Sequence, residues 1–164
     1  MPLKDYLPLK KLTPGLIDYS PGENKVIEFN GIKLKPLICY EAIFPSEVRV
    51  EEPGIIFLHL TNDAYYGNST GPYQHLEKSR ARAIENGATV LRAGNNGISA
   101  IIDYKGQIIK SSRLNAEANI DGYIPNPLNE LTLYSSYGNL LSLLCIILIY
   151  ISTVLLLKLI KKHT

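Results

Sequence analysis

A single cysteine stands where a strand meets a turn. The run VIEFNGIKLKPLICY places Cys39 at the end of an apolar segment, and the EAIFPSEVRV stretch that closely follows indicates a short, irregular helical turn. A side chain at such a junction is exposed at the carboxyl edge of a sheet, where α/β active sites form. A helix N-terminus also favours the thiolate, so the position suits a nucleophile. The alternative is a buried structural cysteine, since free Cys is among the most buried residue types.

Several polar residues have both a functional and a packing interpretation. Glu41 follows the cysteine closely and could polarise a site or hold a substrate group. Asn62 and Asp63, together with the nearby tyrosines Tyr65, Tyr66 and Tyr73, either line a site or lipid entrance or pack a loop. His75 lies on a predicted helix, where packing or capping is a simpler role than general base. Cys145 lies in a long apolar run, so a disulfide with Cys39 is not expected.

Charge and composition exclude several classes of function. The net charge of +2 gives no electrostatic case for a nucleic-acid partner. The three histidines, His59, His75 and His163, are scattered along the sequence, which argues against a zinc site. No motif for a nucleotide, flavin or metal is evident, so no cofactor is expected.

The elements that would position Cys39 alternate between strand and helix. Asn30-Gly31 is a hairpin turn of the I′ kind, and Gly87 is a terminator for the best helix. The order predicts a layered α/β domain. The predicted strands are 26–29, 32–39, 55–61, 89–93, 98–103 and 107–110, with the helix at 72–86.

The C-terminal segment predicts a transmembrane helix. Residues 140–157 carry no charge, and about 20 such residues span a bilayer core. The alternative is a buried core helix, although those are shorter and have a polar face. Two tyrosines precede the run and lysines follow it, which places the C-terminus in the cytoplasm and the domain outside. The expected divisions are a domain at 1–130, a juxtamembrane segment at 131–139, the helix at 140–157 and a basic cytoplasmic tail at 158–164.

Three long segments of the sequence resemble those of a known family. LICYEAIFPSEVR, TNDAYYGNSTGPYQHLEKSRARAIENG and VLRAGNNGISAIIDYKG, in this order, resemble the nitrilase (carbon–nitrogen hydrolase) superfamily. More narrowly, they resemble the apolipoprotein N-acyltransferase family, and the resemblance covers roughly residues 1–157. It implies an α/β fold: the C-terminal half of a nitrilase-like α-β-β-α sandwich, followed by one transmembrane helix.

The resemblance also implies a reaction. Cys39 would be the catalytic nucleophile, supported by Tyr40 and Glu41, and Asp5 falls at an acidic position of the family's pattern. The cysteine would take an acyl chain from a phospholipid as a thioester. It would then deliver the chain to the N-terminal amine of a lipoprotein's diacylglyceryl-cysteine. The setting would be the bacterial inner membrane, with the domain facing the periplasm or exterior.

The chain departs from the family pattern at its start. The family's catalytic glutamate and lysine would precede Met1, so the chain is expected to be inactive alone and active with a complementing N-terminal chain. Two other interpretations remain open. One is a non-catalytic remnant or membrane-anchored interaction domain, and the other is an amidase or nitrilase-type hydrolase with the same nucleophile.

Overall fold

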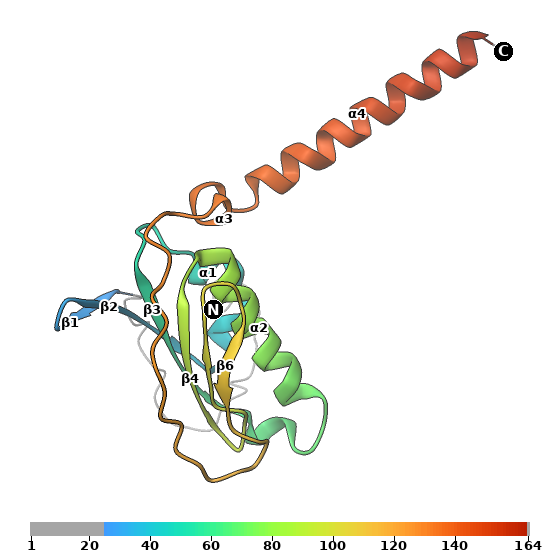
Figure 1. Cartoon of the computed structure of the whole chain (residues 1–164). Coiled ribbons are helices and arrows are strands. Elements are labelled where there is room, and N and C mark those ends of the chain that lie inside the picture. Colours follow the sequence, from blue (N-terminus) through green and yellow to red (C-terminus); the bar gives the residue numbers. More distant parts are fainter. Residues whose placement is uncertain (1–24, 164) are drawn as a thin grey trace, which may run out of the picture.

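The computed structural model of the chain describes residues 25–163, which form one mixed sheet, a helical layer and a long C-terminal helix. The sheet has the strand order β1-β2-β3-β4-β5-β6 (Figure 1). All six predicted strands are present, with shifted ends. Their bounds are β1 Ile27–Phe29, β2 Ile32–Ile38, β3 Ile55–Asn62, β4 Thr89–Asn95, β5 Ala100–Ile102 and β6 Ile108–Ser111.

The centre of the sheet is parallel. Strands β2, β3 and β4 run in the same direction, while β1, β5 and β6 pair antiparallel with their neighbours. The β1–β2 connection is the predicted hairpin, because Asn30 and Gly31 both have positive φ, 50° and 75°, as a type I′ turn requires. The carboxyl ends of the parallel strands therefore bring Cys39, Asp63 and Asn95 to one edge of the sheet.

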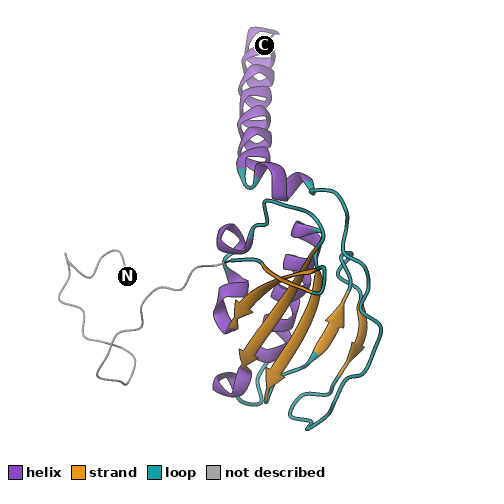
Figure 2. Cartoon of the chain, turned by 90° about the vertical axis from the view of Figure 1, so that its left-hand side faces the viewer, coloured by secondary structure: helices purple, strands orange, loops and turns teal. Residues whose placement is uncertain are grey.

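Helices cover one face of this sheet (Figure 2). They are α1 Pro45–Val48 and α2 Gly71–Asn86, together with the 3₁₀ helices η1 Cys39–Ile43 and η2 Asp63–Tyr66. Alternate residues of β3 point toward α2 because strand side chains have a period of two. The core between the layers consists of Leu37, Val48, Val50, Ile55, Phe57, Leu76, Ala83, Ala88, Val90, Ile98, Ala100 and Ile102.

Helix α2 begins and ends as its sequence predicts. A proline lies in its first turn, where the missing N–H has no intrahelical partner to lose. At the other end Gly87 has φ +62°, and its N–H donates to the carbonyls of Ala83 and Ile84. Two i,i+3 ion pairs form on this helix, Glu77 with Arg80 and Arg82 with Glu85.

The segment after β6 leads back along the sheet to the C-terminal helices. Leu128 N–H donates to the Gly87 carbonyl at 2.8 Å, and the Thr132 hydroxyl donates to the Glu85 carbonyl. These bonds fasten α3, Leu133–Tyr137, near the end of α2. A bend at Gly138, with φ +56°, separates α3 from the final helix.

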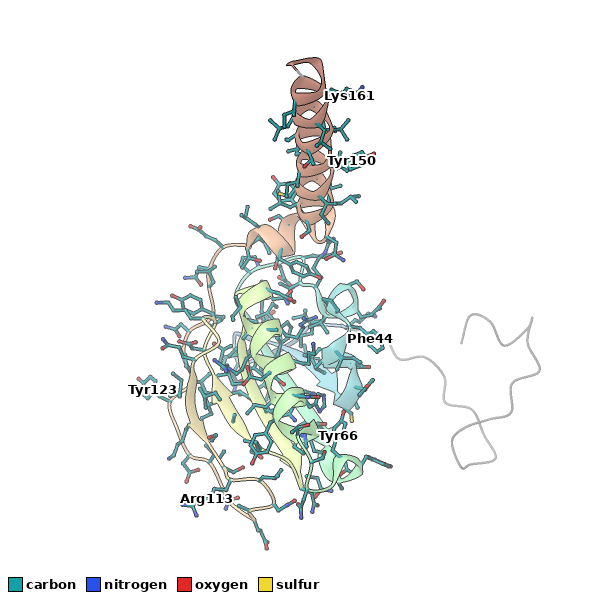
Figure 3. All side chains as sticks on the ribbon, turned by 90° about the vertical axis from the view of Figure 1, so that its right-hand side faces the viewer. Phe44, Tyr66, Arg113, Tyr123, Tyr150 and Lys161 are labelled. Atoms are coloured by element: carbon teal, nitrogen blue, oxygen red, sulfur yellow. The ribbon has the colours of Figure 1, made fainter. Side chains whose placement is uncertain are left out.

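Helix α4, Leu140–His163, projects away from the domain (Figures 1 and 3). It continues through most of the segment expected to be a separate tail. Between Leu140 and Lys158 its mean hydropathy is 2.9 and none of it is buried, so it is long and apolar enough to cross a membrane. The alternative of a core helix does not fit this arrangement, since a core helix packs its apolar side chains against the domain.

Candidate active site

Cys39 occupies a backbone conformation that few non-glycine residues adopt. It is the first residue of η1, directly after β2, and its φ is +50°. A left-handed conformation costs an L-residue on the order of 1–2 kcal/mol, and such strain concentrates at functional sites. The residue is half-buried, in contrast to a fully buried structural cysteine. Surrounding contacts must therefore hold this residue in place.

Two histidines converge on the carbonyl oxygen of Cys39. His59 on β3 approaches it with Nε2 at 2.9 Å, and His75 on α2 approaches it with Nε2 at 3.2 Å. The two rings are edge-to-face, with centroids 5.2 Å apart. Each Nε2 can satisfy this contact only as an N–H donor, because a carbonyl oxygen only accepts. The main chain of Cys39 is thus tied to both layers of the domain.

A buried ion pair supports the two rings from behind. Arg92 on β4 donates through Nη2 to Asp63 Oδ2 at 2.5 Å, and neither side chain is exposed. Asp63 also accepts from His75 Nδ1 at 2.8 Å. Arg92 Nη1 lies 3.0 Å from His59 Nδ1 and 3.0 Å from the Ser79 hydroxyl. Every element around the cysteine therefore contributes a side chain to one connected network.

The thiol itself contacts this network through a threonine. Thr61 Oγ1 lies 3.4 Å from Cys39 Sγ and 3.1 Å from Asp63 Oδ1. A hydroxyl has one proton, so Thr61 donates to either the carboxylate or the sulfur at any moment. When it donates to Asp63, its oxygen is free to accept the S–H proton of Cys39. Thr61 can therefore bond to the Cys39 sulfur in both of its protonation states.

Two titratable groups of this network, His59 and Asp63, have shifted pKa values. Burial, reinforced by the charge of Arg92, lowers the pKa of His59 from 6.5 to about 4, so His59 is neutral near pH 7. Its neutral ring donates from Nε2 and accepts at Nδ1. Burial alone would raise the pKa of Asp63, but the hydrogen bond from His75 and the charge of Arg92 outweigh it. The pKa of Asp63 is held below its ordinary value, and the carboxylate stays ionised.

The other predicted site residues lie around Cys39 in different ways. Tyr40 is half-exposed, and its ring approaches those of Phe44 and His75, each with centroids 6.3 Å apart. The Glu41 carboxylate accepts the backbone N–H of Ile38 at 2.7 Å, so in this structure it closes the turn that carries the cysteine. Asp5 lies outside the described residues.

The NDAYYGNSTG segment divides between the two roles that its sequence left open. Asp63 is fully buried in the network, and the Tyr66 ring packs edge-to-face on His75 with centroids 5.8 Å apart. Tyr65 is almost fully exposed, and Tyr73, which lies just beyond this segment, is half-exposed. Tyr66 lies toward the end of the domain away from α4 (Figure 3). The site is therefore remote from the C-terminal helix.

Sequence reasoning missed most of the residues that surround Cys39. It treated His59 and His75 as scattered, whereas the fold places their rings in contact. It treated Arg92 only as part of a strand. A signal was present, because an arginine inside an apolar strand must find a buried acceptor, and Asp63 follows the neighbouring buried strand. Which of the nearby carboxylates it meets depends on the strand register.

Acidification is expected to destabilise the domain through His59. An unfolded chain protonates this residue below pH 6.5, but the folded chain resists until about pH 4. The unfolded state therefore binds more protons in this window, and the free energy of unfolding falls by up to about 3 kcal/mol as pH drops through it. Asp63 acts at lower pH, because its stabilisation is present above 3.8 and lost below.

Urea unfolding of the chain in detergent between pH 7.5 and 4 would measure this dependence. The matched variant is His59→Gln, which removes the titrating ring and keeps a donor at a similar position. Its unfolding free energy should vary less with pH over the same range. Parallel profiles for the two proteins would contradict the assignment to His59.

Comparison with known proteins identifies the family to which the chain belongs. Residues 7–125 match the carbon–nitrogen hydrolase family. The chain is 50% identical over 156 residues to the apolipoprotein N-acyltransferase of Rickettsia prowazekii (strain Madrid E), covering 92% of this chain and 32% of that protein. It is 39% identical over 144 residues to that of Brucella melitensis biotype 1, covering 77% and 26%. The chain thus spans about a third of the length of its Rickettsia relatives and about a quarter of that of the Brucella relative.

Solved structures show a weaker likeness. An amidase from Nesterenkonia sp. AN1 is 28% identical, covers 59% of this chain and 42% of its own, and has a TM-score of 0.47. The family match extends over well more than half of the chain and includes the Cys39 turn and the buried network behind it. On this evidence the chain belongs to the carbon–nitrogen hydrolase family.

Proposed function

We propose that the chain is the nucleophile-bearing part of an apolipoprotein N-acyltransferase, with Cys39 as the residue that carries the acyl group. The observation that supports this most is the strained, half-exposed Cys39 at the carboxyl end of β2, held by contacts from β3 and α2. The proposed reaction is the one that the names of its relatives state, and the apolar helix α4 would anchor the domain to a membrane. Asp5, Tyr40 and Glu41 are the supporting residues of this proposal.

The proposed reaction has two steps. The Cys39 thiolate adds to an ester carbonyl of a phospholipid, the glycerol oxygen leaves with the bonding electrons and takes a proton, and a thioester remains. The amine of a diacylglyceryl-lipoprotein then attacks the thioester, the C–S bond breaks and an amide forms. The amine gives up a proton, and the thiolate is restored. Splitting aminolysis this way replaces one difficult transfer by two easier ones.

We further infer that a complementing N-terminal chain supplies the general base and the charge-stabilising lysine. The side chain hydrogen-bonded to Cys39 Sγ within residues 25–163 is the Thr61 hydroxyl, which is neither a strong base nor a cation. The sheet also has an apolar face opposite α2, and within the described chain this face is exposed on β1, at the two ends of β2 and at the carboxyl end of β3. The exposed residues on it are Ile27, Phe29, Ile32, Ile38 and Leu60.

A covering partner would meet two physical needs. An apolar sheet face of this kind is a liability in water and normally packs on a second layer. The site is also remote from α4, so a lipid acyl chain needs further apolar surface to reach Cys39. We propose that the partner's own layer covers the sheet face and that its membrane helices complete the lipid path. The domain would face the periplasm or exterior of a bacterial inner membrane, with the C-terminus cytoplasmic.

Trapping of the thioester tests the chemistry. Membranes containing the chain, with and without the proposed complementing N-terminal chain, receive a phospholipid labelled in its acyl chain. We expect hydroxylamine-sensitive label on the chain only when both chains are present, complete loss of label in Cys39→Ala, and full retention in Cys145→Ala. Label that persists in Cys39→Ala, or none in any membrane although the protein is folded, would refute the proposed function and favour the remnant interpretation.

Co-purification tests the partner. Leu60→Glu places a charge on the exposed part of this sheet face and should abolish recovery of the complementing N-terminal chain with this chain, because a buried unpaired charge is costly. The matched control is Ile84→Glu on α2, which is similarly exposed on the helical layer. Equal recovery with both variants would place the partner elsewhere.

A further inference from the structure

The strongest unassigned feature is the pair of imidazoles on the Cys39 carbonyl. His59 and His75 come from different layers, are almost fully buried, and direct Nε2 at the same oxygen at 2.9 and 3.2 Å. A nucleophile needs its sulfur placed, but these rings make their hydrogen bonds to its main chain. A role in packing alone would not require two ring N–H groups to meet at one carbonyl oxygen.

Planarity of the peptide bond gives this contact a consequence. The carbonyl of Cys39 and the N–H of Tyr40 belong to one trans peptide unit, so they point in opposite directions. Fixing the carbonyl toward the buried rings directs the Tyr40 N–H away from the network. Tyr40 is the second residue of η1, and the first N–H groups of a helix have no intrahelical acceptor. A donor is thereby held one residue from the sulfur and pointed away from the core.

We infer that His59 and His75 are positioning residues, which orient the Cys39–Tyr40 peptide so that the Tyr40 N–H stabilises the oxyanion formed when Cys39 attacks an acyl carbonyl. The inference rests on the proposed role of Cys39 as an acyl-accepting nucleophile. Neither histidine touches substrate. The rest of the network holds the rings: Asp63 accepts from His75 Nδ1, and Arg92 and Ser79 meet His59 Nδ1.

The chain offers matched variants that separate the carbonyl contact from the rest of each ring's contacts. A glutamine amide nitrogen takes a position like that of histidine Nε2, so His59→Gln and His75→Gln keep a donor toward the Cys39 carbonyl. His59→Leu removes that donor. His75→Asn keeps a donor at the Nδ1 position toward Asp63 but no longer reaches the carbonyl. All variants carry Cys145→Ser, so that Cys39 is the reacting thiol.

Two reactions of the same sulfur form the test. With p-nitrophenyl butyrate, the thiolate adds to the ester carbonyl, an oxyanion forms, and nitrophenolate leaves as the S-acyl bond is made. With iodoacetamide, the thiolate displaces iodide directly and no oxyanion forms. A positioned N–H assists the first reaction and not the second. General damage to the fold would change both rates together, and unfolding would raise alkylation by exposing the thiol.

We expect His59→Leu and His75→Asn to slow acylation by on the order of ten- to a hundredfold, since loss of an oxyanion donor has effects of this size or larger. Alkylation should change less than about threefold, and the two glutamine variants should acylate at close to the parental rate. Circular dichroism identifies any variant that fails to fold, in which case the other histidine decides the comparison.

The inference would be overturned if His59→Leu and His75→Asn acylated at the parental rate. It would also be overturned if the glutamine variants lost as much acylation rate as His59→Leu and His75→Asn, or if the acylation and alkylation rates fell in parallel. A parent chain that does not acylate above the Cys39→Ala background would overturn it as well. Failure of the proposed function alone looks different, because the chain would then react with the activated ester and take no label from phospholipid.

Discussion

Replacing Arg92 with methionine is expected to lower the free energy of unfolding by about 3–5 kcal/mol, the typical cost of removing one partner of a buried ion pair. Arg92 donates to Asp63 Oδ2 at 2.5 Å, and both side chains are fully buried. Without the guanidinium, the carboxylate keeps its bonds from His75 and Thr61 at Oδ1, but Oδ2 loses the donor that Arg92 supplies.

Urea unfolding of the chain in detergent would measure this loss. Arg80→Met is the matched control, because Arg80 pairs with Glu77 at the partly exposed surface of α2 and should cost less than about 1 kcal/mol. The double variant Arg92→Met/Asp63→Asn should lose less than the sum of its single changes, since it also removes the carboxylate that Arg92 pairs with. A double variant that loses as much stability as that sum, or more, would show that Arg92 acts mainly through other contacts.

Replacing Gly97 with alanine is expected to destabilise the domain by about 1–3 kcal/mol through overpacking against Asp63. A Cβ at this position would lie 2.8 Å from Asp63 Cγ, 3.0 Å from its Cβ, and closer still to Oδ2. The carboxylate cannot retreat, because Arg92 and His75 hold its two oxygens. The displacement should also slow acylation of Cys39 by activated ester, because Asp63 anchors His75.

Gly122→Ala is the control for this prediction. Its new Cβ would lie 2.8 Å from Ile101 Cδ1, the end of a flexible side chain that can rotate away, so little stability should be lost. Thermal unfolding of both variants beside the parent would compare them. A Gly97→Ala variant as stable as Gly122→Ala would mean that Asp63 has more freedom than its contacts indicate.

Much of the secondary structure could be predicted from local signals. The Asn30-Gly31 hairpin, the proline in the first turn of α2, the Gly87 terminator and the apolar run that forms α4 all act within a few residues. Such signals depend on φ preferences and on missing N–H groups, which do not require knowledge of the rest of the fold. The strand predicted at 98–103 is shorter in the structure, Ala100–Ile102. Before it, the Ile98 carbonyl accepts from the Arg92 side chain instead of extending the strand.

The sequence by itself indicated Cys39 as the candidate nucleophile, and it determined where the long apolar helix begins and the class of the domain. Only the tertiary structure decided what holds Cys39 in place. His59, Asp63, His75 and Arg92 lie on four different elements, and their meeting depends on the β3–β4 register that pairs His59 with Arg92 and on the packing of α2 across the sheet. A shift of one residue in that register would turn Arg92 to the other face of the sheet, because strand side chains alternate.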